Sequence, residues 1–199
     1  LHLCSHNLES IQTNNYDSSK AKHNLLAEVC YAAKYEGDLI KTHYTPYQAT
    51  YGDSQLCTVL ARSFADIGDI VRGKDLFLGY NERDREKKKK IQDNLNKIFK
   101  EIYEELKKKK GRNGQIEARY NDKDGNYYKL REDWWTANRA TIWEAMTCSE
   151  QLKGNKYFRN TCNGGEQTKG YCRCGDGKSK GANADQVPTY FDYVPQFLR

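Results

Sequence analysis

Residues 61–73 carry the apolar spacing that most restricts how this chain folds. The large apolar side chains recur at intervals of three and four residues, at Phe64, Ile67, Ile70 and Val71. That spacing places them on one side of an α-helix. Gly73 follows at the position where a helix commonly ends in a left-handed residue. The sequence therefore predicts a helix over about residues 54–71 with one face in the core.

Three further segments show helical spacing. Residues 18–36 carry one apolar side after two serines, and Gly37 is predicted to interrupt this helix. Residues 82–110 contain a narrow apolar seam, and residues 133–146 present two packed faces. Between these two segments, the turn cluster at 121–126 is predicted to link a short strand pair. The elements as a whole predict an all-α fold, a helical bundle with long irregular loops.

Cysteines are the second constraint on the fold. None of them stands in a Cys-x-x-Cys pair, which argues against a zinc ribbon or a thioredoxin-like redox site. Disulfides formed in an oxidising compartment are the better interpretation, and they supplement an aliphatic core that is thin for 199 residues. An odd number leaves one thiol without a partner inside the chain. The seven are Cys4, Cys30, Cys57, Cys148, Cys162, Cys172 and Cys174.

Four blocks of the chain resemble the Duffy-binding-like domain, alpha type, in the family's order. They are residues 25–37 (LLAEVCYAAKYEG), 61–77 (ARSFADIGDIVRGKDLF), 133–148 (DWWTANRATIWEAMTC) and 188–199 (PTYFDYVPQFLR). This domain type forms the N-terminal head of the malaria parasite's variant erythrocyte membrane proteins. The resemblance implies an incomplete Duffy-binding-like domain. Residues 1–53 would end its first subdomain, and residues 54–199 would form a helical second subdomain with a Cys- and Gly-rich loop at 149–187.

The resemblance also implies a function. It predicts a host-cell receptor-binding adhesin on the extracellular face of the infected erythrocyte membrane, as part of a longer membrane-anchored protein. Family candidates for the partner are heparan sulfate, blood-group sugars and complement receptor, with rosetting and cytoadherence as the outcome. Antibodies are further expected partners, because the loop at 149–187 tolerates sequence change and can therefore vary antigenically. The alternative is a structural and antigenic scaffold, with adhesion carried by neighbouring domains.

Positive charge is confined to one segment. Residues 81–112 hold thirteen Lys or Arg against seven Asp or Glu, an excess equal to the +6 of the whole chain. One interpretation is a solvated helix face with lysines that favour the helix C-terminus. The other is a docking surface for a polyanion, for which the candidate glycan contacts are Lys87, Lys88, Lys89, Lys90, Lys97, Lys100, Lys107, Lys108, Lys109, Lys110 and Arg112. Nucleic acid is not expected, since the segment lacks aromatic platforms beside the lysines.

The positions of the cysteines lead to a hypothesis about their pairing. Cys30 and Cys148 each lie in a helical block, and we expect them to bond each other. Cys57 is expected to bond one of the loop thiols Cys162, Cys172 and Cys174, which would tie the loop to the second helix.

The sequence predicts no enzymatic activity, no cofactor and no metal site. It contains none of the nucleophile-elbow, phosphate-loop or His-Glu-x-x-His motifs. The alternation of Asp122, Asp124 and Asn126 resembles a calcium loop, but the Gly and Glu that such a loop requires are absent at its sixth and twelfth positions. No apolar run is long enough for a membrane span, so this segment is not expected to insert into a bilayer.

Overall fold

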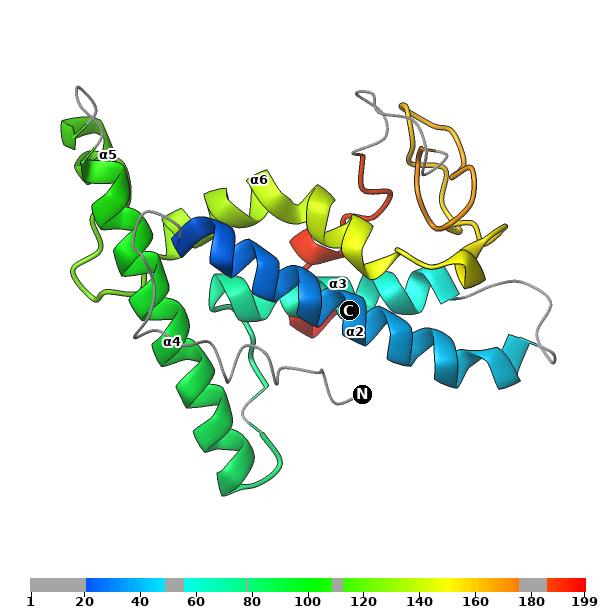
Figure 1. Ribbon diagram of the computed structural model, residues 1–199, viewed down its shortest axis with the longest axis horizontal. Helices are drawn as coiled ribbons and strands as arrows, with labels where there is room; N and C mark the ends of the chain where they lie inside the picture. Colours follow the sequence, from blue (N-terminus) through cyan, green and yellow to red (C-terminus); the bar gives the residue numbers. More distant parts are fainter. Residues whose placement is uncertain (1–20, 49–55, 78, 109–112, 176–185) are drawn as a thin grey trace. The chain divides into compact units, whose positions relative to one another are not determined.

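A computed structural model describes residues 21–48, 56–77, 79–108, 113–175 and 186–199. Its α-helices are α2 (Ala21–Gln48), α3 (Leu56–Arg72), α4 (Glu82–Lys107), α5 (Asn113–Tyr120) and α6 (Tyr128–Met146), with short 3₁₀ turns η2 (Glu150–Leu152), η3 (Phe191–Tyr193) and η4 (Gln196–Leu198) (Figure 1). These described ranges contain no β-strand, which confirms the all-α prediction. None of the helices within them is both long and apolar enough to cross a membrane.

Contacts divide the described residues into two compact units. Of these residues, unit 1 holds 30–48, 56–68, 139–175 and 186–199, and unit 2 holds 21–29, 69–77, 79–108 and 113–138. Three of the helices, α2, α3 and α6, contribute one part of their length to each unit. Each unit has its own buried aromatic side chains and its own buried arginine contacts.

The core of unit 1 forms around α3 and the second part of α6. Phe64 packs edge-on against Trp143, with ring centroids 5.2 Å apart. The Trp143 indole Nε1 also donates to the backbone carbonyl of Cys172 at 3.1 Å, so the indole is both packed and satisfied. The buried hydroxyl of Ser63 on α3 donates to the Glu36 carboxylate of α2 at 3.0 Å. These contacts join α2, α3, α6 and the loop that follows α6 within this unit.

The core of unit 2 forms along the apolar seam of α4. Asn81 caps the helix by accepting from the Asp84 amide at 2.9 Å. Phe99 from the seam packs edge-on against Trp134 of α6, at a centroid distance of 6.1 Å. The buried Arg131 guanidinium lies over Phe99 and donates to Asn96. Burial lowers the pKa of Arg131 to about 10, because desolvation disfavours its charged form. Val71, Gln92 and Asn96 supply neutral oxygen acceptors to this guanidinium.

Three predictions of local structure are wrong. The α2 helix continues through Gly37 to Gln48 instead of stopping there. Gly37 is required for packing, since a Cβ at this position would collide with the backbone carbonyl of Met146. Residues 113–120 form α5 in place of the expected strand pair, and α6 begins at Tyr128, five residues before the predicted start.

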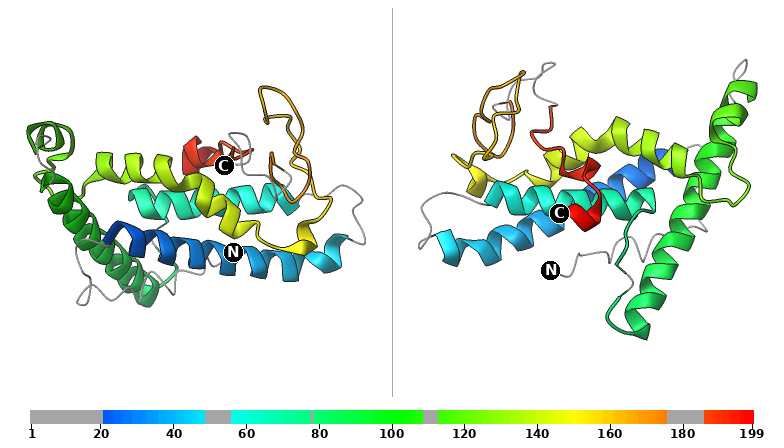
Figure 2. Two further views of the ribbon diagram at one scale, coloured as in Figure 1. Left: turned by 45° about the horizontal axis from the view of Figure 1, so that its top comes forward. Right: turned by 180° about the vertical axis from the view of Figure 1, so that it is seen from behind.

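Residues 149–175 form an irregular loop in unit 1, which we call the cysteine loop. It contains η2 and two isolated β-bridges, Cys162 with Glu166 and Gly170 with Arg173. Figure 2 shows it in orange, next to one end of α3. The segment 186–199 contacts α3 through Arg199 and Asp66 and α6 through Asp192 and Arg139, each at 2.8 Å, within the same unit.

Candidate functional site

The lysines predicted as glycan contacts fall into distinct environments. Lys88 is partly buried, and its ammonium forms an ion pair of 2.9 Å with Asp75. Lys107 pairs with Glu117 at 3.2 Å, and the hydrogen bond from its ammonium to Glu117 raises its pKa. Both side chains therefore support the fold of unit 2 and are weaker candidates for ligand contact. Three of the predicted residues lie outside the described part of the chain: Lys109, Lys110 and Arg112.

Four lysines share the solvent side of α4, opposite the buried seam. At 3.6 residues per turn, positions 89, 90, 97 and 100 all project away from Leu95. All four side chains are exposed, and none forms an ion pair with a described carboxylate. We call this set the outer lysine face: Lys89, Lys90, Lys97 and Lys100. Lys87 and Lys108 are exposed at its edges.

Carboxylates interrupt the outer lysine face. Glu86, Asp93 and Glu104 are exposed on the same side of α4. The positive potential of this helix is therefore lower than its lysine count indicates, because each carboxylate partly cancels a neighbouring ammonium. The face spans about 16 Å from position 89 to position 100, at ~1.5 Å per residue.

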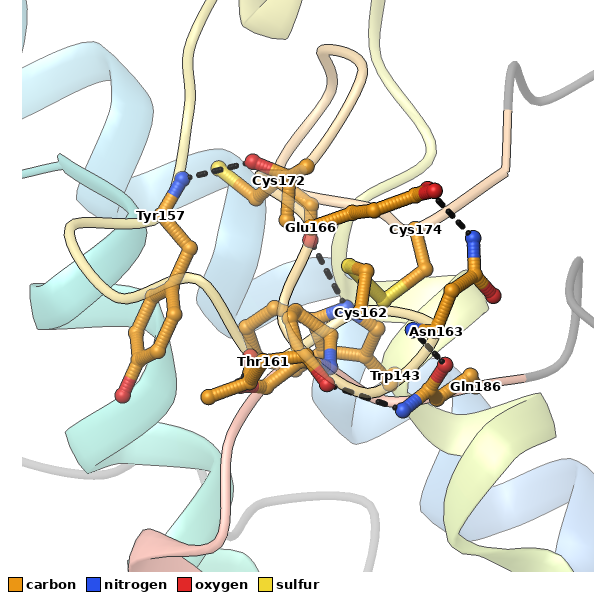
Figure 3. Close-up of a disulfide and its surroundings, with 11 residues drawn as sticks. Trp143, Tyr157, Thr161, Cys162, Asn163, Glu166, Cys172, Cys174 and Gln186 are labelled. Atoms are coloured by element: carbon orange, nitrogen blue, oxygen red, sulfur yellow. Dashed lines mark hydrogen bonds between the residues drawn. A yellow bond between two sulfur atoms is a disulfide. The ribbon is translucent and has the colours of Figure 1, made fainter.

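The disulfides confirm part of the predicted pairing. Cys57 near the start of α3 bonds Cys172, with their Cα atoms 5.4 Å apart. Cys162 bonds Cys174 inside the cysteine loop (Figure 3). The expected link between the second helix and the loop is therefore present, and Cys172 is the loop thiol that makes it. Cys4 lies outside the described residues.

The predicted bond between Cys30 and Cys148 is wrong. Both are free thiols in the structure, Cys30 half-buried and Cys148 exposed. The end of α6 meets α2 at Gly37, where the Met146 carbonyl occupies the space of a Cβ. Cys30 lies two helical turns before Gly37 on α2, about 10 Å along the axis at ~1.5 Å per residue, so the end of α6 that leads to Cys148 packs at a different level of α2.

This arrangement predicts unequal reactivity of the two thiols. Burial, with the nearby Glu144 carboxylate as a smaller cause, raises the pKa of Cys30 and reduces its thiolate fraction near neutral pH. We expect iodoacetamide at pH 7.5 to alkylate Cys148 about tenfold faster than Cys30. Mass spectrometry of peptides from timed samples measures both rates, and urea-unfolded protein supplies the control in which they converge. Equal rates in the folded protein would contradict the described environments.

The sequence did not single out the contact between Arg139 and Asp192. Arg139 donates through Nε and Nη2 to the two Asp192 carboxylate oxygens, both at 2.8 Å. Its guanidinium also lies among the rings of Phe64, Tyr190 and Tyr193, at 5.1 to 5.8 Å from their centroids. No sequence signal identifies this pair, because its members are 53 residues apart.

Comparison with known proteins identifies a matching family and similar solved structures. The Duffy binding domain family matches residues 1–199. No curated protein matches the chain. Among solved structures, the NTS-DBL1(alpha-1) domain of Plasmodium falciparum membrane protein 1 (PfEMP1) from the varO strain is 42% identical, with a TM-score of 0.71. The double domain of NTS-DBL1-alpha and CIDR-gamma from the same strain is also 42% identical, with a TM-score of 0.73.

A third solved structure is the ICAM-1-binding DBLbeta domain of PfEMP1 IT4var13, which is 33% identical with a TM-score of 0.66. The match covers 99% of this chain in all three cases, but 40%, 25% and 39% of the respective solved chains. The chain thus spans less than half the length of these structures. Because the family match runs over the whole sequence and the solved relatives exceed 30% identity, the chain belongs to the Duffy binding domain family.

Proposed function

We propose that the chain is a receptor-binding adhesin module of the infected erythrocyte surface, part of a longer membrane-anchored protein. In this proposal residues 1–53 end one subdomain and residues 54–199 form the next. Support comes from the family, in which one similar domain is described as ICAM-1-binding, and from two disulfides that indicate an oxidising compartment. Binding takes place on an exposed surface and needs no catalytic group.

The outer lysine face is the contact that we propose for the receptor. The observation that carries it is the exposure of four ammonium groups that pair with no described carboxylate. Flexible ammonium groups bind sulfate and carboxylate groups as point charges, and such contacts weaken with salt. Sulfated glycosaminoglycan of the heparan type is therefore the partner class we favour. Blood-group sugars and complement receptor are the other candidates, and their binding would depend less on positively charged side chains.

The experiment compares wild type with a variant in which the outer lysine face is changed to glutamine. If each exposed ion contact contributes about 0.5 kcal/mol, four contacts contribute about 2 kcal/mol, so heparin affinity falls roughly 30-fold. Surface plasmon resonance on immobilised heparin at several salt concentrations measures the loss. The salt dependence of the remaining binding should also become less steep.

A matched control separates local contact from total charge. It carries the same change on four exposed cations elsewhere: Lys34, Arg62, Lys123 and Lys129. An equal loss of heparin affinity in this control would show that net charge, and not the outer lysine face, determines binding. Wild-type protein without saturable binding would favour the alternative, a structural and antigenic scaffold whose neighbouring domains adhere.

A further inference from the structure

The cysteine loop is a well-anchored surface despite its lack of regular secondary structure. The Cys57–Cys172 bond attaches it to α3, and the Cys162–Cys174 bond closes it on itself. Backbone bonds add to this: the Tyr171 amide donates to Leu152 at 3.1 Å and the Cys172 amide to Asn155 at 3.0 Å. Figure 3 shows further hydrogen bonds around the Cys162–Cys174 disulfide. Side chains on this loop are therefore held in defined positions.

Two stretches of the loop direct alternate side chains outward. The Tyr157 amide donates to the buried Thr168 hydroxyl at 2.8 Å, which brings residues 156–158 beside residues 167–169. Tyr157 and Thr168 are buried, whereas their neighbours on both sides are exposed. The outward set contains Lys156, Phe158, Gln167 and Lys169. The ammonium of Lys156 reaches the Gln167 amide oxygen at 3.4 Å, which is consistent with this side-by-side placement.

Two more cations border this outward set. Arg159 lies over the Phe158 ring at 5.3 Å from its centroid, and that ring is 56% exposed. Lys153 adjoins Gly154, and a Cβ on Gly170 would lie 3.6 Å from the Gly154 nitrogen. The turn that carries Lys153 therefore lies against the backbone next to Lys169. We call the five exposed residues the loop cation surface: Lys153, Lys156, Phe158, Arg159 and Lys169.

The charges on this surface are unbalanced. Residues 149–175 contain five Lys or Arg and two Asp or Glu. Arg173 contacts Glu144 outside the loop at 3.6 Å, and the loop's two carboxylates accept from neutral donors, Glu150 from the Tyr171 hydroxyl and Glu166 from the Asn163 amide. No described carboxylate forms an ion pair with any of the four surface cations. The outer lysine face also lacks ion pairs with described carboxylates, but exposed carboxylates lie among its lysines and lower its positive potential.

We propose that the loop cation surface is a second contact for a sulfated polysaccharide, on unit 1. The four cations attract sulfate groups, and the exposed Phe158 ring can stack on the apolar C–H face of a sugar ring. An acidic peptide would use the cations but not the ring. The proposal depends on the adhesin assignment only for its biological context, because its residues are separate from those of α4.

The experiment measures binding of a heparin-derived octasaccharide to the whole chain by isothermal titration calorimetry. Changing Lys153, Lys156, Arg159 and Lys169 to glutamine should weaken the affinity at least ~10-fold. Phe158→Ser, which keeps every charge, should weaken it about threefold. The same variant should leave binding of a polyglutamate peptide unchanged. A fully desulfated octasaccharide should bind neither wild type nor any variant. The control variant with glutamine at Lys34, Arg62, Lys123 and Lys129 should bind the octasaccharide as wild type does.

The outcomes separate this proposal from the proposed function. Loss of binding only in the outer lysine face variant would overturn the loop assignment and leave the adhesin contact on α4 intact. Loss only in the loop variant would do the reverse. If Phe158→Ser has no effect and polyglutamate binds as well as the octasaccharide, the surface recognises negative charge alone and the glycan assignment fails. Acetylation of the wild-type lysines gives a readout without any variant: the octasaccharide should protect Lys153, Lys156 and Lys169, and unprotected lysines would overturn the proposal.

Discussion

Removing the Cys57–Cys172 disulfide lowers the free energy of unfolding by about 4 to 5 kcal/mol, because the bond closes a loop of more than one hundred residues in the unfolded chain. The two cysteines are 115 residues apart in sequence, and both are fully buried. Replacing both by alanine therefore restores conformational freedom to most of the chain between α3 and the cysteine loop. Urea unfolding followed by circular dichroism measures the change, with the slope of the transition recorded alongside the midpoint.

The second disulfide is the matched control. Cys162 and Cys174 are 12 residues apart, so replacing both by alanine should cost about 3 kcal/mol by the same loop-closure argument. The loss should also be confined to the cysteine loop, leaving hydrogen exchange in α4 unchanged. If the short bond proves the costlier of the two, then local packing around the loop, and not chain entropy, accounts for the stabilisation.

Arg139→Ala should destabilise unit 1 by about 3 to 5 kcal/mol, the usual cost of leaving one partner of a buried ion pair without the other. The Asp192 side chain is 0% exposed and that of Arg139 is 12% exposed. Loss of the guanidinium also removes a 2.8 Å bond to the Thr189 carbonyl and the contacts with the surrounding rings. Thermal unfolding detects the loss, and hydrogen exchange should locate it in residues 186–199.

The chain offers an ion pair of the same chemistry at the surface for comparison. Arg119 contacts Asp133 at 2.6 Å, but their side chains are 52% and 37% exposed. Solvent screening weakens such exposed pairs, so Arg119→Ala should have little effect on stability. Similar losses in both variants would contradict the role that we assign to burial of the Arg139–Asp192 pair.

Helix positions were the part of the fold that local pattern predicted best. The seam of α4 matches the buried face in the structure, and Phe64, Ile67 and Val71 of the predicted α3 stripe are buried, with Ile70 half-buried. α4 presents a single apolar face, and such a face has the same period whatever it packs against. α3 is buried on more than one side, because Ser63, Asp69 and Arg72 are buried as well. Gly37 shows the limit of this approach. Its missing side chain ordinarily weakens a helix, but here it gives Met146 room to pack.

The candidate surfaces follow the same division. The lysine clusters were visible in the sequence, yet Lys88 and Lys107 proved to be bound to carboxylates that lie elsewhere in unit 2, Asp75 and Glu117. The loop cation surface was not predicted, since its cations are spread between positions 153 and 169 without a run. Its composition becomes apparent only when the bond between Tyr157 and Thr168 brings two stretches together.

By itself, the order of residues determined the helical class, the oxidised character of the chain and its family, because periodicity, cysteine count and block motifs are local properties. Tertiary structure alone decided which cysteines pair, which lysines form no ion pair with a described carboxylate, and which arginine anchors residues 186–199. These outcomes depend on distances between residues far apart in sequence. Such distances are set by how the helices pack, and a pattern within one helix carries no record of them.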